Sequence, residues 1–141
     1  MNQTDKKTIT VAATVNAPMN KVWQFWSEPE HIVNWNNASN DWHTTKAVND
    51  LKRGGNFNYR MEAKDGSFGF DFEGKYSEVI LNESIEYTIA DGRKVQILFE
   101  ALDDETHITE TFEAEEVHPE ELQQDGWQAI LNNFKRYTET H

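Results

Sequence analysis

The sequence lacks cysteine and has few basic residues. Because there is no cysteine, disulfide bonds, thiolate nucleophiles and cysteine-ligated zinc sites are excluded. Lysine and arginine total 13 against 25 aspartate and glutamate residues, which gives a net charge of −12 spread along the chain. A field of this sign repels phosphate backbones and anionic membrane surfaces, so we expect no nucleic-acid partner.

Long apolar runs are also missing. No segment approaches the roughly 18 apolar residues that a membrane-spanning helix needs, and the polar residues 1–7 are not followed by the apolar stretch of a secretory signal. We therefore expect no membrane insertion, no export and a cytoplasmic location. No repeat or linker divides the 141 residues, so we expect residues 1–141 to form a single domain.

Alternation of apolar and polar residues is the strongest positive signal. It predicts strands over 8–15, over several segments from Gly55 onward and over about 106–114, with a weaker strand over 46–48. Asp65-Gly66 and Asp91-Gly92 are typical hairpin turns. The side chains expected to share the inner face of the sheet are Phe57, Tyr59 and Met61; Phe68, Phe70, Phe72 and Tyr76; Ile85, Tyr87 and Ile89; and Val95, Ile97 and Phe99.

Three segments have helical patterns. Pro18 suits the first turn of a helix that continues to Ser27. Ser27 and Glu30 have the spacing of a capping box, which predicts a second helix through about Val33. Pro119 opens a final helix of about 21 residues, or about 31 Å. Its apolar stripe consists of Leu122, Trp127, Ile130, Leu131, Phe134 and Tyr137.

This order of elements predicts an α+β fold, in which an antiparallel sheet of six or seven strands carries two short helices and one long C-terminal helix. Short motifs in the same order point to a family: Val15-Asn16-Ala17-Pro18 before Val22-Trp23, then Trp35, Gly54-Gly55-Asn56-Phe57, Gly74-Lys75-Tyr76 and Gly126-Trp127. With these the chain resembles the START-related, birch-pollen-allergen-like superfamily. Within it, the chain is similar to the C-terminal domain of the activator of the ninety-kilodalton heat-shock chaperone's ATPase.

The resemblance implies a helix-grip fold, in which the long helix and the curved sheet enclose lipids, polyketides or flavonoid-like rings. We expect the following residues to line such a cavity, with a packed core as the alternative: Phe57, Tyr59, Met61, Phe70, Phe72, Tyr87, Phe99, Trp127, Ile130 and Phe134. Trp35 and Trp42, placed in the loop after the second helix, could form a lid over the entrance or could pack over the sheet edge.

Glu110 is the most informative single residue. Alternation between Ile108 and Phe112 points its carboxyl group into the interior, where a charge must find a partner or be neutralised. It could accept a hydrogen bond from a ligand or act as a general acid. The alternative is that a strand end or bulge leaves it at the solvent-facing mouth.

Three functions remain open. The first is an intracellular, stress-related carrier or sensor of a small hydrophobic ligand. The second is an aromatase, cyclase or hydrolase that uses Glu110 with Tyr59 or Tyr87. The third is a chaperone-associated protein. It ranks last, because the sequence begins at the first predicted strand and we expect no separate N-terminal domain for binding the chaperone. No cofactor and no metal are expected, since the histidines show no ligand spacing.

Overall fold

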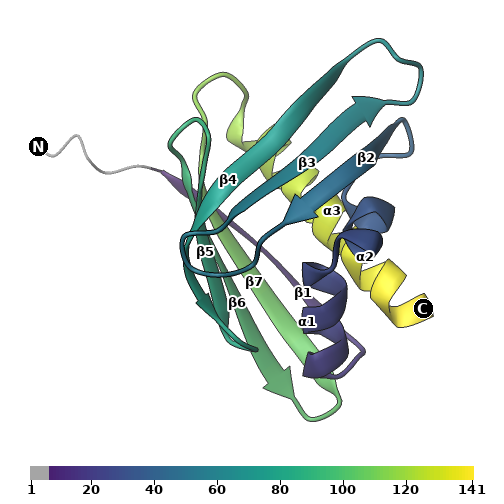
Figure 1. Cartoon of the computed structure of the whole chain (residues 1–141), viewed down its shortest axis with the longest axis vertical. Coiled ribbons are helices and arrows are strands. Elements are labelled where there is room, and N and C mark those ends of the chain that lie inside the picture. Colours follow the sequence, from purple (N-terminus) through teal and green to yellow (C-terminus); the bar gives the residue numbers. More distant parts are fainter. Residues whose placement is uncertain (1–6) are drawn as a thin grey trace, which may run out of the picture.

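The computed structural model describes residues 7–141 and contains one seven-stranded antiparallel sheet with three helices on one side of it (Figure 1). The strand order across the sheet is β1-β7-β6-β5-β4-β3-β2. In chain order the elements are β1 (Thr8–Val15), α1 (Met19–Ser27), α2 (Pro29–Trp35), β2 (Trp42–Asn49), β3 (Asn56–Ala63), β4 (Gly69–Ile80), β5 (Ser84–Ile89), β6 (Lys94–Leu102), β7 (Glu105–Glu113) and α3 (Glu120–Thr140). The predicted α+β fold and the length of the last helix are confirmed.

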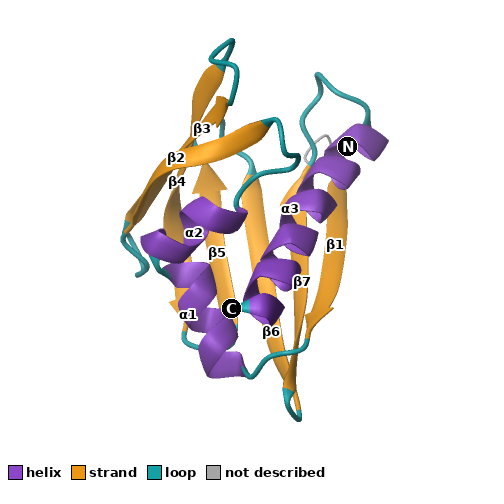
Figure 2. Ribbon diagram, turned by 90° about the vertical axis from the view of Figure 1, so that its right-hand side faces the viewer, coloured by secondary structure: helices purple, strands orange, loops and turns teal. Residues whose placement is uncertain are grey.

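Alternation places the core on the inner face of the sheet. In β7, Thr106, Ile108, Glu110 and Phe112 are buried, whereas the residues between them are partly exposed. The same alternation appears in β5 and β6. Figure 2 shows that all three helices lie over this one face. Among residues 7–141, no helix is long and apolar enough to span a bilayer.

The helix α3 is tied to the edge strand β1 by polar side chains. Three alternate carbonyl groups of β1 accept hydrogen bonds from side chains of α3. The bonds run from Gln124 Nε2 to Thr10 O (3.5 Å), from Gln128 Nε2 to Ala12 O (3.0 Å) and from Lys135 Nζ to Thr14 O (2.7 Å). The helix therefore occupies a fixed position along this edge of the sheet.

Both predicted glycine turns are present. Gly66 has a φ of 79° and Gly92 a φ of 95°, which is the left-handed region that glycine adopts without strain. In the first turn, Asp65 Oδ1 accepts a hydrogen bond of 2.8 Å from the backbone N–H of Ser67. The β3–β4 and β5–β6 hairpins therefore have the connections that the sequence indicates.

Gly74 in β4 is required for a different reason, which is close packing. A Cβ atom at this position would lie 2.7 Å from the carbonyl oxygen of Thr88 and 2.8 Å from Cε2 of Phe57. The ring of Phe57 therefore rests directly on the backbone of β4, on the inner face of the sheet.

The predicted capping box is wrong. Ser27 is the last residue of α1, and its Oγ donates a 2.6 Å hydrogen bond to the carbonyl oxygen of Trp23. Such a bond inside a helix competes with capping of the next one. The N-cap of α2 is Glu28, which makes no side-chain capping bond, and Pro29 occupies the first turn as expected.

The strand β2 is longer than the weak prediction over 46–48. It begins at Trp42, so this residue lies in a strand and not in a loop, and Trp35 is the last residue of α2. Two features hide β2 from sequence patterns. It is an edge strand, and an irregularity in its pairing with β3 between Thr44 and Lys46 interrupts the alternation.

One half of the interior is filled by aromatic rings. This packed half consists of Trp23, Phe99 and Phe134, with Trp26 and Trp35 at its border, where they also face the rest of the interior. Phe134 on α3 contacts Trp26 and Trp35 at centroid distances of 4.8 and 4.9 Å, and Phe99 on β6 contacts Trp23 at 5.1 Å. The helices α1 and α2 thus close this half of the sheet with their own side chains.

Candidate functional site

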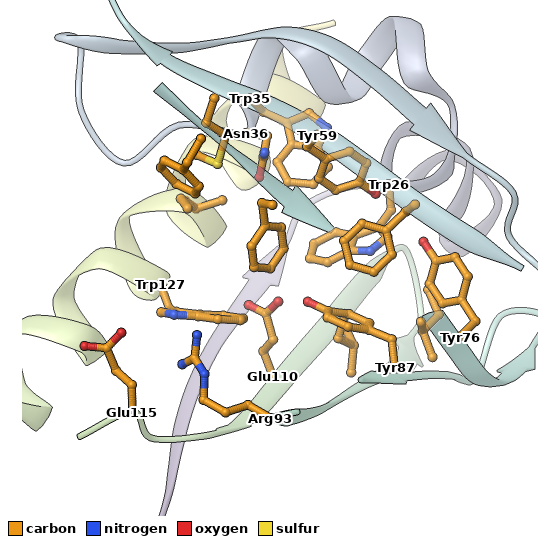
Figure 3. A pocket seen from close by; sticks show the side chains of 17 residues that line it. Trp26, Trp35, Asn36, Tyr59, Tyr76, Tyr87, Arg93, Glu110, Glu115 and Trp127 are labelled. Carbon is orange, nitrogen blue, oxygen red and sulfur yellow. The ribbon is translucent and has the colours of Figure 1, made fainter. Parts of the chain in front are cut away.

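A cavity of about 290 Å³ lies in the other half of the interior, between the inner face of the sheet and α3 (Figure 3). We call this part the cavity half. Of the residues predicted for a ligand site, the structure places ten on its wall: Trp35, Phe57, Tyr59, Met61, Phe70, Phe72, Tyr87, Glu110, Trp127 and Ile130. The sheet supplies most of this wall, and α3 contributes Trp127 and Ile130.

Three predicted residues lie outside the wall. Phe99 and Phe134 belong to the packed half, because α1 and α2 cover that end of the sheet. Trp42 lies near Phe68 and Phe70, at ring centroid distances of 6.0 and 5.8 Å, and is not among the residues that line the cavity. Phe68 itself precedes β4 and is 62% exposed, although alternation predicted an inward position.

Seven further residues line the cavity that the sequence prediction of the site left out: Trp26, Asn36, Tyr76, Ile85, Arg93, Ile97 and Glu115. A signal existed for some of them. Tyr76, Ile85 and Ile97 occupy inward positions of the predicted strands, and Trp26 is on the apolar side of the first helix. Arg93 and Glu115 are on connections outside the strands, where no periodicity indicates direction.

Aromatic rings from opposite sides of the molecule enclose the cavity. Trp127 of α3 stacks on Phe112 of β7 at a centroid distance of 4.0 Å and an interplanar angle of 11°. Its ring also meets Phe72 of β4 edge-on at 6.1 Å. Phe57 of β3 contacts Tyr87 of β5 at 4.8 Å. Such walls suit an apolar or aromatic guest.

Glu110 is buried on the cavity wall without a partner. It faces inward on β7, which lies between β1 and β6, and only 6% of its surface is exposed. Figure 3 shows its carboxyl group pointing into the cavity. Its side chain makes no hydrogen bond and no ion pair with residues 7–141. Burial raises the pKa of this carboxyl to about 8.

Tyr87 presents its hydroxyl group to the same space (Figure 3). This hydroxyl makes no hydrogen bond with residues 7–141. Burial is the main cause that raises the pKa of Tyr87 well above its usual value, and the negative charge of an ionised Glu110 raises it further. Two unpaired polar groups therefore meet on one wall of an otherwise aromatic cavity.

The other two tyrosines of the wall are tied into the protein. Tyr59 is hydrogen-bonded to Tyr76, whose hydroxyl donates to Asn49 Oδ1 at 2.5 Å. Asn49 Nδ2 in turn donates to the carbonyl oxygen of Ser27 at 2.7 Å. Burial raises the pKa of both Tyr59 and Tyr76. Their hydroxyl groups thus connect the wall to the end of α1.

Comparison with known proteins agrees with this architecture. The family model of the Activator of Hsp90 ATPase homolog 1-like protein matches residues 16–139. The chain belongs to this family. The fold places the family within the START-related superfamily that the motifs indicated. No curated protein matches the chain.

Solved structures of related proteins cover almost the whole chain. An AHSA1-like protein from Aeromonas hydrophila, determined by NMR, is 43% identical, with 95% of this chain and 93% of the other covered and a TM-score of 0.89. A protein from Cytophaga hutchinsonii is 56% identical, with coverages of 96% and 92% and a TM-score of 0.80. A Chromobacterium violaceum protein, with 21% identity, coverages of 94% and 98% and a TM-score of 0.84, shows likeness of fold alone.

Several motif residues that carry the family resemblance meet at the cavity. Phe57, Tyr76 and Trp127 line it, and Gly74 permits the close approach of Phe57 to β4. Gly55 directly precedes β3, where a Cβ atom would lie 2.1 Å from the carbonyl oxygen of Asp50. The AHSA1-like motifs thus form part of the cavity wall and of its support.

Two charged residues complete the wall, and both have partners. Arg93 Nε donates to Asp91 Oδ2 at 2.8 Å, and its Nη1 donates to the carbonyl oxygen of Glu113 at 3.4 Å. The Glu115 carboxylate pairs with His118, and Gln123 of α3 donates to the backbone carbonyl of Glu115 at 3.1 Å. Glu110 is therefore the charged group of this AHSA1-like cavity that lacks a partner among residues 7–141.

The chemistry available at the wall is that of proton donors. With a pKa of about 8, Glu110 is mostly protonated at pH 7, and the phenol of Tyr87 is protonated too. Neither group is a base at that pH. Among residues 7–141 there is no cluster of three or more histidine and acidic residues that could hold a metal ion.

Proposed function

We propose that the protein binds a small apolar or aromatic molecule in the cavity between α3 and the sheet, as an intracellular carrier or sensor. The observation that supports this most is the cavity itself. Aromatic side chains from α1, α2, β3, β4, β5 and α3 surround about 290 Å³ that these side chains leave unfilled. The fold belongs to a superfamily whose members commonly hold small hydrophobic ligands.

The volume limits the size of the ligand. About 290 Å³ is at the lower end of the roughly 300 to 1,000 Å³ that small-molecule sites occupy. This volume suits a molecule of one or two rings better than a sterol or a long acyl chain.

The protonation states of the polar groups on the cavity wall favour binding over catalysis. The enzyme hypothesis nominates Glu110 with Tyr59 or Tyr87. A protonated Glu110 suits a general acid, but Tyr87 also holds its proton at neutral pH, so neither of these two groups supplies a base beside that acid. Tyr59 is already bonded to Tyr76. An interaction with a chaperone remains the third hypothesis, and it draws only on the name of the family.

The test is a thermal-shift and NMR chemical-shift titration against one-ring and two-ring aromatics, flavonoids, fatty acids and sterols. We expect a saturable stabilisation by the small aromatics. The amide shifts should cluster on α3 and the inner faces of β3–β7. Absence of a response to every class would overturn the proposal.

A matched pair of variants locates the binding. Ile130→Trp on α3 adds a large ring at the cavity wall and should abolish the response. Leu122→Trp adds an equally large ring on the same helix, at a position that is 56% exposed, and should leave binding unchanged. Equal binding by both variants would place the ligand somewhere else.

A further inference from the structure

One polar group on the wall of the cavity differs from the other charged groups there, because it has no partner. Arg93 and Glu115 both have partners, whereas Glu110 has none among residues 7–141 although it is 94% buried. A buried carboxyl group without a partner is costly. A ligand that brought a charged donor would hold this carboxyl group ionised and paired, and would gain the most at this position.

The surroundings of Glu110 favour one kind of donor. Trp26, Tyr87 and Trp127 line the same cavity, and Phe112 covers one face of Trp127. Aromatic rings attract cations to a face that is left open, most strongly in the case of tryptophan. The protein as a whole carries a net charge of −12, which raises the local concentration of cations at its clefts. Charge, rings and the unpaired carboxyl therefore point to the same type of group.

We propose that the cavity takes a small organic amine, whose ammonium group pairs with the Glu110 carboxylate while its ring lies against the aromatic wall. This inference rests on the proposed function and narrows its ligand class. Tyr87, whose hydroxyl is next to Glu110 in Figure 3, can accept a further hydrogen bond from the ammonium group through its oxygen.

Other ligand chemistries fit this wall less well. A carboxylate can bond Glu110 only in its protonated form and gains no ion pair there, because Arg93, the arginine that lines the cavity, is already paired with Asp91. An alcohol could bond the protonated form of Glu110, but it would gain nothing from the ring faces as a cation does. An amine uses both features of the wall.

The proposal predicts that binding is coupled to pH. Because the pKa of the free carboxyl is about 8, formation of the ion pair below pH 8 releases a proton from Glu110. Affinity should rise about tenfold per unit between pH 6 and pH 7.5 and level off above pH 8. The titratable and charged groups that face Glu110 across the cavity are Tyr59, Tyr76, Tyr87, Arg93 and Glu115. The register partners of Glu110 on β1 and β6 are Val11 and Ile97, and α3 contributes Trp127 and Ile130 to the same cavity; none of these four residues titrates.

The experiment compares amines with neutral molecules of the same shape. Tryptamine and phenethylamine are titrated by calorimetry against 2-(indol-3-yl)ethanol and 2-phenylethanol, in buffers of different ionisation enthalpy at pH 6, 7 and 8. We expect the amines to bind about ten- to a hundredfold more tightly than the alcohols. Close to one proton should be released per amine bound at pH 7.

Substitution of the carboxyl group gives the control. Glu110→Gln keeps the shape but removes the charge, so the amines should lose their advantage while the alcohols bind as before. Glu78→Gln removes the same charge from an exposed position on β4 and should change neither. Thermal unfolding of both variants verifies that they fold.

The outcomes separate this inference from the proposed function. Equal or tighter binding of the alcohols, or an amine preference that survives Glu110→Gln, would overturn the inference and leave a site for neutral ligands. Binding of neutral aromatic molecules other than these alcohols, with no binding of the amines, would likewise overturn the inference and leave a site for neutral ligands. If no small aromatic of any charge binds, both the inference and the proposed function fail.

Discussion

The two halves of the interior are built from the same kinds of residue, but they differ in how completely the rings fill the space and in whether the buried polar groups have partners. In the packed half, rings from α1, α2, α3 and β6 fill the space, and the indole N–H of Trp35 donates to the carbonyl oxygen of Phe25 at 3.0 Å. In the cavity half, rings of similar size leave about 290 Å³ open, and Glu110 has no partner among residues 7–141. Stability is therefore concentrated in one half, and a capacity for binding is left in the other.

The largest expected effect is a pH dependence of stability that arises in the cavity half, from Glu110. The pKa of Glu110 is about 8 in the folded protein and near its ordinary value of 4.5 in the unfolded chain. Between these values the folded state holds a proton that the unfolded state has released. The contribution of Glu110 to the free energy of unfolding is therefore complete below pH 4.5 and is lost as the pH rises through 8. At about 1.36 kcal/mol per pKa unit, the loss is on the order of 4 to 5 kcal/mol.

Urea denaturation from pH 4.5 to 8.5 checks this prediction. The free energy of unfolding of the unsubstituted protein should fall with pH relative to that of Glu110→Gln, while Glu78→Gln should follow the unsubstituted protein. If the curves for the protein and for Glu110→Gln ran parallel, Glu110 would not carry the coupling.

Truncation of one ring in each half should have opposite consequences for stability and binding. Phe134→Ala leaves a void in the packed half, where Phe134 is fully buried, and should cost about 3 to 5 kcal/mol. Trp127→Ala should cost roughly half as much, because part of its ring already faces open space. Chemical denaturation and ligand titration on both variants should rank Phe134 first for stability and Trp127 first for affinity.

Gly74→Ala tests the boundary between sheet and cavity. The added methyl group would collide with Phe57 and with the carbonyl oxygen of Thr88, so we expect a loss of about 1 to 3 kcal/mol. Because the ring of Phe57 must move, the aromatic signals of the cavity wall should shift in NMR spectra. Unaltered spectra and stability would mean that β4 can relax without moving Phe57.

The smallest expected effect has the opposite sign. Gly126 is inside α3, and apart from its chain neighbours and the nearby backbone of the helix itself, no atom lies within 4 Å of the place where a Cβ would stand. Gly126→Ala should therefore stabilise the protein by about 0.5 to 1 kcal/mol, measured by thermal unfolding. A loss of stability would show that the position is needed for close packing after all.

Sequence periodicity predicted which way side chains face but not what lies opposite them. Ile108, Glu110 and Phe112 were placed correctly, because alternation in a strand is a local property. Phe99 and Phe134 also face inward, yet they are not on the cavity wall, since that depends on where α1 and α2 rest on the sheet. No local pattern encodes such a long-range contact.

The errors in secondary structure have equally specific causes. Ser27 resembles a helix cap in sequence, but its hydroxyl bonds back to Trp23 within α1. The edge strand β2 carries an irregularity that breaks its alternation between Thr44 and Lys46. Arg93 and Glu115 reach the cavity from connecting segments, whose direction is set by the hydrogen bonds they make in the folded chain.

The attachment of α3 to β1 also bears on how the protein avoids joining other sheets. The carbonyl groups of Thr10, Ala12 and Thr14 already accept hydrogen bonds from side chains of α3, so a foreign strand finds these three acceptors taken. The opposite edge, β2, carries a pairing irregularity and an exposed lysine, Lys46, both of which disfavour edge-to-edge aggregation. The two borders of the sheet are thus protected by different means, one by a covering helix and the other by irregularity and charge.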